Sequence, residues 1–400
     1  RVLWGRMPSL KLLLLVSATP LAAAFSLPLA IEAMPVSMGV WQPLAPLVGA
    51  ALLAGGVDRA AGLSLRGVSW FAAVLAAAQV AAGATLLADP LLLGSLAGIC
   101  GVVATIAGAA WNGPGADDAD FEKAFGGKVV WITGASSGIG EALVYAFHKA
   151  GARVVLSARR VSELERVRDA CVRESGGRGG GVPLILPLDL SKPGEMKGKA
   201  EEATAALAGA GIDLLVHNGG VSSRALAEEM DWELDQAILT VNFLSPVALT
   251  KAVLPAMLAA RQGHVVVLSS VQGLVGLPAR TAYSSSKHAL HGFFDSLRAE
   301  VASRGLAVSL ICPGYVRTAL SLNAVTGTGA KHGVMDAATE KGMDPAVFAK
   351  KTLAAIARKD SQVVIADDVS AHVAPYLRVL LPNVLEWVMR KRGKKVLPPA

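Results

Sequence analysis

The sequence of 400 residues predicts an α/β fold, a doubly wound parallel sheet of the Rossmann type, preceded by an α-helical transmembrane region. Three observations predict it. From Lys128 onward, short β-branched runs alternate with segments of helical periodicity, as in parallel sheets covered by helices. A glycine-rich turn, Gly134–Gly140, joins the first run to the first helical segment. Before Trp111 charged residues are few, and the apolar runs approach the roughly 20 residues of a helical bilayer crossing.

Residues 1–111 are the predicted hydrophobic membrane region, with two to four transmembrane helices. The two strongest spans, Val68–Ala88 and Leu91–Trp111, contain no charged residue. Pro43–Val57 is short, and Leu12–Ile31 is interrupted by prolines. Leu12–Ile31 also fits a secretory signal with an alanine-rich cleavage region. For the whole region, a buried core of apolar helices is the alternative.

With four such spans, the lysine and arginine residues of the flanking loops all fall on one side of the membrane, and the loops with Glu32 and Asp89 fall on the other. Arg1, Arg6 and Lys11 fall on one side, and Arg59 and Arg66 return to it. The positive-inside rule then places the rest of the chain in the cytosol. We expect a multi-pass membrane protein of the endoplasmic reticulum, with a plastid or another endomembrane as the alternatives.

A short connector, residues 112–125, separates this region from the α/β domain, residues 126–368. Asn112–Gly115 breaks helices, and an acidic stretch, Asp117–Glu122, follows it. A solvated linker explains these carboxylates better than a metal site, because no further ligand stands at a suitable spacing.

Residues 369–400 are predicted to be a C-terminal amphipathic helix and basic tail. The apolar stretch Val373–Met389 precedes the basic run Arg390–Lys395. This order fits binding to an anionic membrane surface, and a solvated last turn with a frayed end is the alternative.

Within the α/β domain, the elements follow one another in regular alternation. Gly138–Ala150 and Val161–Glu174 are the first two predicted helices. The predicted strands are Val129–Thr133, Arg153–Ser157, Pro183–Leu188, Asp213–His217, His264–Ser269, Ala307–Ile311 and Gln362–Ala366.

The turn after the first strand contains the glycines of a nucleotide-binding site. Gly134, Gly138 and Gly140 would let the backbone approach a pyrophosphate, whose charge meets the N-terminus of the following helix. A glycine-rich turn is a weak signal by itself, and its spacing differs from the common dinucleotide fingerprint.

Ser270, Tyr283 and Lys287 are the candidate catalytic residues. Tyr283 and Lys287 stand four residues apart, so on a helix they share one face, where the ammonium would lower the pKa of the phenol. A phenol tuned in this way exchanges a proton near neutral pH. Taken without Ser270, the pair could equally be an ordinary surface contact.

From Lys128 to Ala366 the chain resembles the short-chain dehydrogenase/reductase family. The resemblance lies in the glycine turn, in the order of the polar residues after successive strands, and in Pro313–Thr318. One departure is His217–Gly220, where the family usually has Asn-Asn-Ala-Gly; His217 is expected to be a structural replacement. The residues that the resemblance assigns to cofactor binding are Gly134, Ser136, Ser137, Gly138, Ile139, Gly140, Arg159, Asp189, Leu190, Asn218, Gly219, Tyr283, Lys287, Pro313, Gly314, Val316 and Thr318.

The resemblance also implies a mechanism. Tyr283 supplies a proton to the carbonyl oxygen of the substrate, and Ser270 hydrogen-bonds the same oxygen. Lys287 holds the nicotinamide ribose and lowers the pKa of the tyrosine, while Asn242 anchors a water in a proton relay. At the end of the second strand, Arg159 and Arg160 suit a 2′-phosphate, so NADP(H) is favoured over NAD(H), with Arg159 as the main contact.

The C-terminal part is similar to the membrane-associated branch of the family that contains members 7 and 7B. This likeness implies a small-molecule, lipid-like carbonyl or alcohol substrate of the steroid, retinoid or alkyl/acyl dihydroxyacetone phosphate class, with the lipid bilayer as a partner. The sequence leaves open whether the protein forms a homodimer. Residues 319–343 follow the position of a substrate-covering segment, and their glycines fit either a lid or disorder. The alternative function is a catalytically silent dinucleotide-binding membrane scaffold or redox sensor.

Other partners are not expected. The net charge of +7 is not gathered into a basic face with interleaved aromatics, so no nucleic acid is predicted. Cys100, Cys171 and Cys312 have no metal or disulfide spacing and are expected to be reduced and buried. His288 and His291 share a helix face, but without a third ligand they predict no metal site.

Overall fold

A computed structural model describes residues 118–175 and 179–396. The predicted transmembrane region, its alternative as a signal segment, and Cys100 therefore lie outside the described residues. The described residues belong to the unit Pro114–Ala400.

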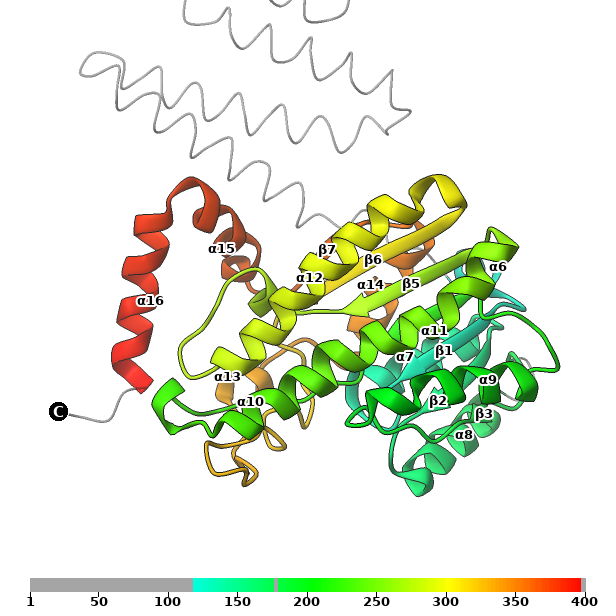
Figure 1. Cartoon of the computed structure of the whole chain (residues 1–400), viewed down its shortest axis with the longest axis horizontal. Coiled ribbons are helices and arrows are strands. Elements are labelled where there is room, and N and C mark those ends of the chain that lie inside the picture. Colours follow the sequence, from blue (N-terminus) through cyan, green and yellow to red (C-terminus); the bar gives the residue numbers. More distant parts are fainter. Residues whose placement is uncertain (1–117, 176–178, 397–400) are drawn as a thin grey trace, which may run out of the picture. The chain divides into compact units, whose positions relative to one another are not determined.

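A seven-stranded parallel sheet forms the centre of this unit, with the strand order β3-β2-β1-β4-β5-β6-β7 (Figure 1). The strand order reverses between β1 and β4: from this point the chain builds the sheet outward in both directions. Doubly wound sheets bind their ligands at such a point. The predicted doubly wound sheet is confirmed. The strands are β1 Val129–Thr133, β2 Arg153–Ser157, β3 Leu184–Ile185, β4 Leu214–His217, β5 Gly263–Leu268, β6 Leu306–Pro313 and β7 Gln362–Ile365.

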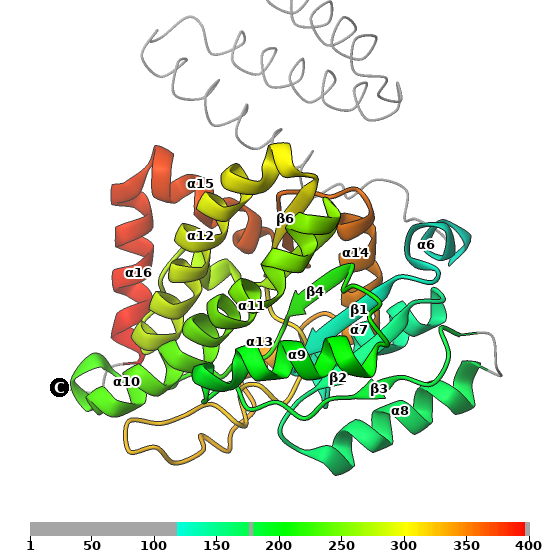
Figure 2. The same cartoon turned by 45° about the vertical axis from the view of Figure 1, so that its right-hand side comes forward.

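Alternate residues of each strand face opposite layers of helices, because side chains on a strand alternate between the two faces. In β1, Val130 and Ile132 belong to one buried cluster and Val129 and Trp131 to the other. The first layer contains α6 Asp118–Phe125, α7 Gly138–Lys149, α8 Val161–Ser175 and α14 Pro345–Ala357. The second contains α9 Met196–Ala206, α11 Ser245–Ala260 and α12 Thr281–Val301 (Figure 2).

The remaining helices gather around the carboxyl ends of the strands. They are α10 Trp232–Leu239, α13 Ala337–Glu340, α15 Val369–Leu380 and α16 Pro382–Val396. Within the described ranges, the continuous helical stretch Trp232–Ala260 alone is long and apolar enough to cross a bilayer. Leu249, Val253 and Met257 of this stretch pack on the sheet, so we interpret it as a core helix.

Three segments differ from the sequence prediction. The acidic connector forms the helix α6 from Asp118 onward, because Phe121 and Phe125 pack into the core. Only Leu184 and Ile185 of the predicted third strand pair with β2. The C-terminal segment forms two helices, α15 and α16, because Pro382 cannot continue a helix and instead begins α16.

Residues 319–343 are folded onto the domain. Val325 pairs with Ser223 and Lys331, and Met343 pairs with Val316. These bridges hold the segment against the residues that follow β4 and β6, so the segment is ordered.

Candidate active site

The glycine-rich turn lies between β1 and α7, at the point where the strand order reverses. Gly134 and Gly138 have φ of +67° and +60°, in the left-handed region that favours glycine. A Cβ at Gly140 would lie 2.2 Å from the carbonyl oxygen of Gly134. Only glycine therefore fits this close helix–strand approach, and the turn leaves a cradle without side chains that fits a dinucleotide pyrophosphate.

Asn218 and Gly219 brace the same turn from the end of β4. The Asn218 side-chain amide donates to the carbonyl oxygens of Thr133 and Gly134, at 3.1 Å each. The Thr133 hydroxyl accepts the backbone N–H groups of Asn218 and Gly219, at 3.1 and 3.2 Å. These two predicted cofactor residues thus have a structural role in shaping the cradle.

Cations gather at the far end of the cradle, after β2. Arg160 reaches the Ser136 hydroxyl at 3.5 Å, and Arg166 donates to the Ser136 carbonyl at 3.3 Å. Arg159 is exposed and lies near Asp189. Burial raises the pKa of Asp189, but hydrogen bonds from Ser191 and the charge of Arg159 bring it below its ordinary value. Arg166 also pairs with Glu141 and Glu163, at 2.7 and 2.9 Å, so its charge is largely compensated. The sequence did not indicate its place beside Ser136, because that depends on how α8 packs against α7.

Tyr283 and Lys287 lie on one face of α12, both buried, as their spacing predicts. The Lys287 ammonium is 5.7 Å from the centre of the Tyr283 ring and donates to the Leu268 carbonyl at 2.8 Å. Burial lowers the pKa of Lys287 to about 8. The lysine therefore still carries its charge at pH 7, in a buried site at the end of β5.

The predicted lowering of the Tyr283 pKa is wrong for this structure. Burial raises the pKa of Tyr283, because the desolvated phenolate loses its hydration. The hydrogen bond with Ser270 and the charges of Arg280 and Arg224 oppose this effect. The two arginines, and not Lys287, are thus the cations that act on the phenol here.

Asn242 lies in a π-helical turn, Thr240–Leu244, between α10 and α11. Its side chain accepts the Val221 N–H at 2.8 Å and donates to the Val221 carbonyl at 2.8 Å and to the Ser286 hydroxyl at 2.9 Å. Such single-turn widenings are frequent at functional sites. This one turns the amide of Asn242 toward α12.

Gly220 keeps space open between Asn242 and Lys287. A Cβ at this position would lie 3.1 Å from Asn242 Oδ1 and 3.6 Å from Lys287 Nζ. The structure shows that its missing side chain matters, because the two polar groups face the same point.

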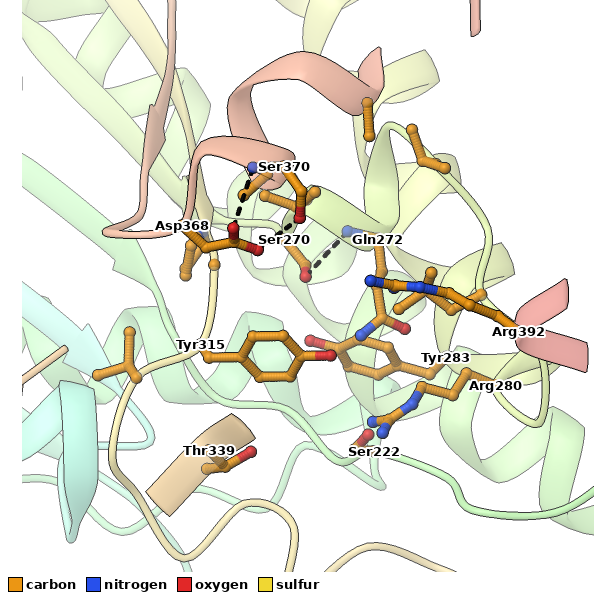
Figure 3. Close-up of a pocket in the computed structure, with 18 of the residues that line it drawn as sticks. Ser222, Ser270, Gln272, Arg280, Tyr283, Tyr315, Thr339, Asp368, Ser370 and Arg392 are labelled. Atoms are coloured by element: carbon orange, nitrogen blue, oxygen red, sulfur yellow. Dashed lines mark hydrogen bonds between the residues drawn. The ribbon is translucent and has the colours of Figure 1, made fainter. Parts of the chain in front are cut away.

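Ser270 and Tyr283 open onto a cavity of about 310 Å³ (Figure 3). The Ser270 hydroxyl accepts the Gln272 N–H at 3.1 Å, which fixes its position in the wall. The predicted cofactor residues Pro313, Gly314, Val316 and Thr318 border the same cavity.

The C-terminal helices form part of the wall of this cavity. Leu377 of α15 and Leu385, Val388 and Met389 of α16 line the cavity. Arg378 ties α15 to the catalytic helix, donating to the Leu274 carbonyl and to His288 Nε2 at 2.6 Å each. The inner face of this predicted membrane-surface segment is therefore a wall of the site.

The remaining candidate residues have ordinary partners. His217 Nε2 bonds the Thr250 hydroxyl at 2.7 Å, and burial lowers the pKa of His217 to about 3, so it is a neutral packing residue as expected. His291 bonds Ser269 at 2.9 Å. Cys171 and Cys312 are buried free thiols, as predicted.

Comparison with known proteins agrees with this geometry. A family model of short chain dehydrogenases matches residues 128–328. A dehydrogenase/reductase SDR family protein 7-like from Anopheles gambiae is 50% identical over 270 residues, which cover 68% of this chain and 84% of the relative. Member 7B of the same family from Bos taurus is 43% identical over 268 residues, 67% of this chain and 82% of the relative.

Solved structures share the fold. A short chain dehydrogenase from Escherichia coli CFT073, complexed with NADPH, is 27% identical with a TM-score of 0.54, covering 62% of this chain and 99% of that one. One from Shigella flexneri, complexed with NADP, is 26% identical with a TM-score of 0.52, covering 61% and 98%.

The parallel sheet, the glycine cradle and the buried Ser270, Tyr283 and Lys287 define a nicotinamide-dependent oxidoreductase that interconverts carbonyl and alcohol groups. The chain belongs to the short-chain dehydrogenase/reductase family, in the branch of members 7 and 7B.

Proposed function

We propose that this protein is a membrane-bound, NADP(H)-dependent oxidoreductase that interconverts a carbonyl and an alcohol on a lipid-like substrate of the steroid, retinoid or alkyl/acyl dihydroxyacetone phosphate class. One observation carries the proposal. Ser270 and Tyr283 lie in the wall of a cavity that is also lined by Leu377 of α15 and by Leu385, Val388 and Met389 of α16. An apolar carbonyl compound would bury its surface there and present its oxygen to two hydroxyl groups.

When bound, the nicotinamide supplies or accepts the hydride. Tyr283 donates the proton to the carbonyl oxygen during reduction, and its raised pKa keeps the phenol protonated at neutral pH. The Ser270 hydroxyl, fixed by Gln272, hydrogen-bonds the same oxygen and positions it. Asn242 and Lys287 face the space beside Gly220, where a water would connect the lysine to the proton path.

The cofactor preference should depend on Arg159. We expect Arg159→Asp to move the preference from NADPH toward NADH by at least tenfold in kcat/KM. The carboxylate would repel the 2′-phosphate and accept a hydrogen bond from a free ribose hydroxyl. Steady-state kinetics with both cofactors measure this ratio, and Arg304→Asp, an exposed arginine of the turn after α12, is the matched control. An unchanged ratio would mean that another group, such as Arg160 or Arg166, holds the phosphate.

The membrane association is supported by the outer side of the C-terminal helices. Val379, Val384 and Trp387 are 78%, 44% and 56% exposed. The Lys391 ammonium lies 3.7 Å from the centre of the Trp387 ring, which places a cation beside this apolar surface. Exposed apolar residues beside cations suit an anionic headgroup layer.

We expect the full chain to resist alkaline carbonate extraction and its C-terminus to face the cytosol. The reason is the charge-free spans before Trp111 and the position of the basic flanking residues on one side of the membrane in a four-span arrangement. Protease protection in sealed microsomes, with a tag after Ala400, measures the orientation. A tag that survives until detergent is added would place the domain in the lumen and favour a cleaved signal at Leu12–Ile31.

The assay for the function as a whole is NADPH oxidation by the full chain in detergent, with a panel of apolar aldehydes and ketones. The alternative function, a catalytically silent scaffold or redox sensor, predicts saturable cofactor binding without turnover. The joint presence of Asn242, Ser270, Tyr283 and Lys287 favours catalysis, since a sensor needs the cradle but no proton donor.

A further inference from the structure

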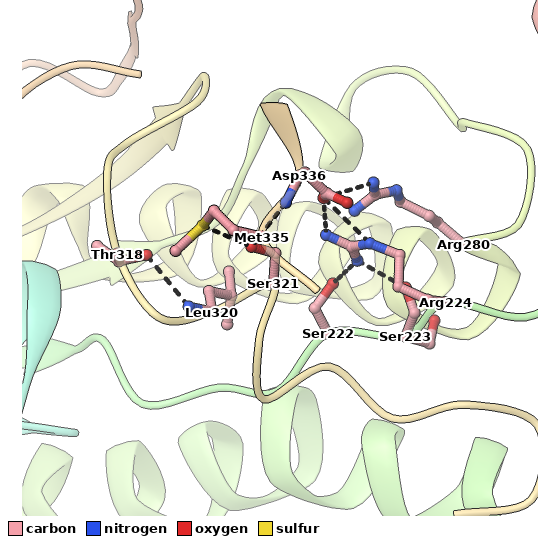
Figure 4. A network of polar contacts seen from close by, with 9 residues as sticks. All are labelled: Ser222, Ser223, Arg224, Arg280, Thr318, Leu320, Ser321, Met335 and Asp336. Carbon is pink, nitrogen blue, oxygen red and sulfur yellow. Dashed lines mark hydrogen bonds and ion pairs between the residues drawn. The ribbon is translucent and has the colours of Figure 1, made fainter. Parts of the chain in front are cut away.

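Two arginines share one carboxylate at the wall of the cavity (Figure 4). Arg224 follows β4, Arg280 immediately precedes α12, and Asp336 precedes α13 in the covering segment. Arg224 Nη2 and Nε lie 2.5 and 3.2 Å from Asp336 Oδ2, and Arg280 Nη2 lies 3.1 Å from the same oxygen. Three distant segments of the chain therefore meet at this ion cluster.

The cluster carries a net positive charge in a largely buried position. The side chains of Arg224 and Arg280 are 10% and 14% exposed. The other charged residues that line the cavity are Arg392 and Asp368, whose opposite charges sum to zero. One positive charge remains, and a partly desolvated cation is costly unless an anion pairs with it.

The two arginines differ in their unused hydrogen-bond donors. Arg224 uses four of its five N–H donors, because Nη1 donates to the Ser222 hydroxyl and the Ser223 carbonyl at 2.7 Å each, in addition to the two contacts with Asp336. Among the described residues, the Arg280 side chain has a hydrogen bond to Asp336 alone, of 3.1 Å through Nη2. A guanidinium has five N–H donors, so most of those of Arg280 remain available on the cavity side.

Arg280 stands three residues before Tyr283, and both border the cavity (Figure 3). The charges of Arg280 and Arg224 act directly on the phenol, lowering its pKa against the larger effect of burial. An anion held by Arg280 would therefore lie in the same cavity as a carbonyl that accepts the proton of Tyr283.

We infer that Arg280, oriented by Asp336 and supported by the charge of Arg224, is a substrate-binding residue that takes an acidic group, a phosphate or a carboxylate, of an otherwise apolar carbonyl substrate. The inference rests on the proposed function of the cavity as the substrate site. It narrows the lipid-like class to amphipathic acids in which the acidic group stands close to the reacting carbonyl. The apolar remainder would extend between α15 and α16.

The test is equilibrium binding, which does not depend on turnover. Octyl phosphate, octanoate and 1-octanol are titrated into the full chain in the presence of NADP by calorimetry. We expect one or both anions to bind about tenfold or more tightly than 1-octanol, since hydrogen bonds to charged groups are strong. Comparing the affinities of octyl phosphate and octanoate shows whether the site prefers a phosphate or a carboxylate.

Variants test whether the preference for anions over 1-octanol depends on the ion cluster of Arg224, Arg280 and Asp336. Arg280→Gln should remove it, and Arg304→Gln, with the same charge change at an exposed site, should retain it. Asp336→Asn keeps an acceptor for both arginines but removes the competing charge, so it should strengthen anion binding by at least threefold. A merely structural role of the cluster predicts weaker binding in both Arg280→Gln and Asp336→Asn.

Equal affinity for the anions and the alcohol, or an anion preference that survives in Arg280→Gln, would overturn the inference. Turnover of neutral ketones together with either result would leave the proposed function standing. Anion binding that depends on Arg280, without turnover of any carbonyl, would instead uphold the site and refute the oxidoreductase function.

Discussion

Tyr283→Phe is expected to lower kcat by about 10²- to 10⁴-fold, the usual contribution of a positioned acid or base. The substitution removes the hydroxyl that lies next to Ser270 and leaves the ring in its buried place on α12. The affinity for NADPH should stay within about threefold, because the glycine cradle and the arginines after β2 are untouched. Single-turnover kinetics and cofactor fluorescence measure the two quantities separately.

Tyr376→Phe is the matched control for this experiment. It removes the same hydroxyl from α15, outside the set of residues that line the cavity. Its activity should equal that of the wild type. A Tyr283→Phe variant with activity within threefold of the wild type would falsify the assignment of the proton donor.

Lys287→Met is expected to abolish turnover and at the same time to stabilise the fold at neutral pH. In the folded state burial lowers the pKa of Lys287 from 10.5 to about 8. One pKa unit corresponds to about 1.4 kcal/mol, so the buried ammonium costs about 3 kcal/mol below pH 8. Loss of the hydrogen bond to Leu268 offsets about 1 kcal/mol of this, which leaves the variant more stable by about 2 kcal/mol.

The sign of the pH dependence follows from the lowered pKa. Between pH 8 and 10.5 the unfolded chain binds a proton at this lysine that the folded chain has released, so wild-type stability rises with pH. The difference in the free energy of unfolding between Lys287→Met and the wild type should therefore shrink between pH 8 and 10.5 and disappear above this interval. Urea unfolding at pH 7, 9 and 10.5 measures the difference, with Lys251→Met on the exposed side of α11 as the control. A variant less stable than the wild type at pH 7 would contradict a buried, destabilising ammonium.

The strands and first helices were predictable because their signals are local. The alternation of β-branched runs with helical periodicity places β1, β2, β4, β5, β6 and β7 within a few residues of their observed ends. β3 is shorter than predicted, since pairing depends on the neighbouring strand and not on the apolar run alone. The helix α6 was not predicted for a similar reason. Its two phenylalanines stand among acidic residues, and they pack against a core that is distant in sequence.

The sequence by itself determined the parts of the site that depend on spacing along the chain. The glycines at 134, 138 and 140 and the Tyr283–Lys287 pair occupy the predicted positions because a turn or a helix places residues at set intervals. The tertiary structure decided the walls and the electrostatics of the cavity. Asp336 meets Arg224 across 112 residues, and α16 covers the site only because α15 docks on α12 through Arg378. Burial, which reverses the expected shift in the Tyr283 pKa, is likewise a property of the assembled domain, since desolvation depends on every segment packed around the phenol.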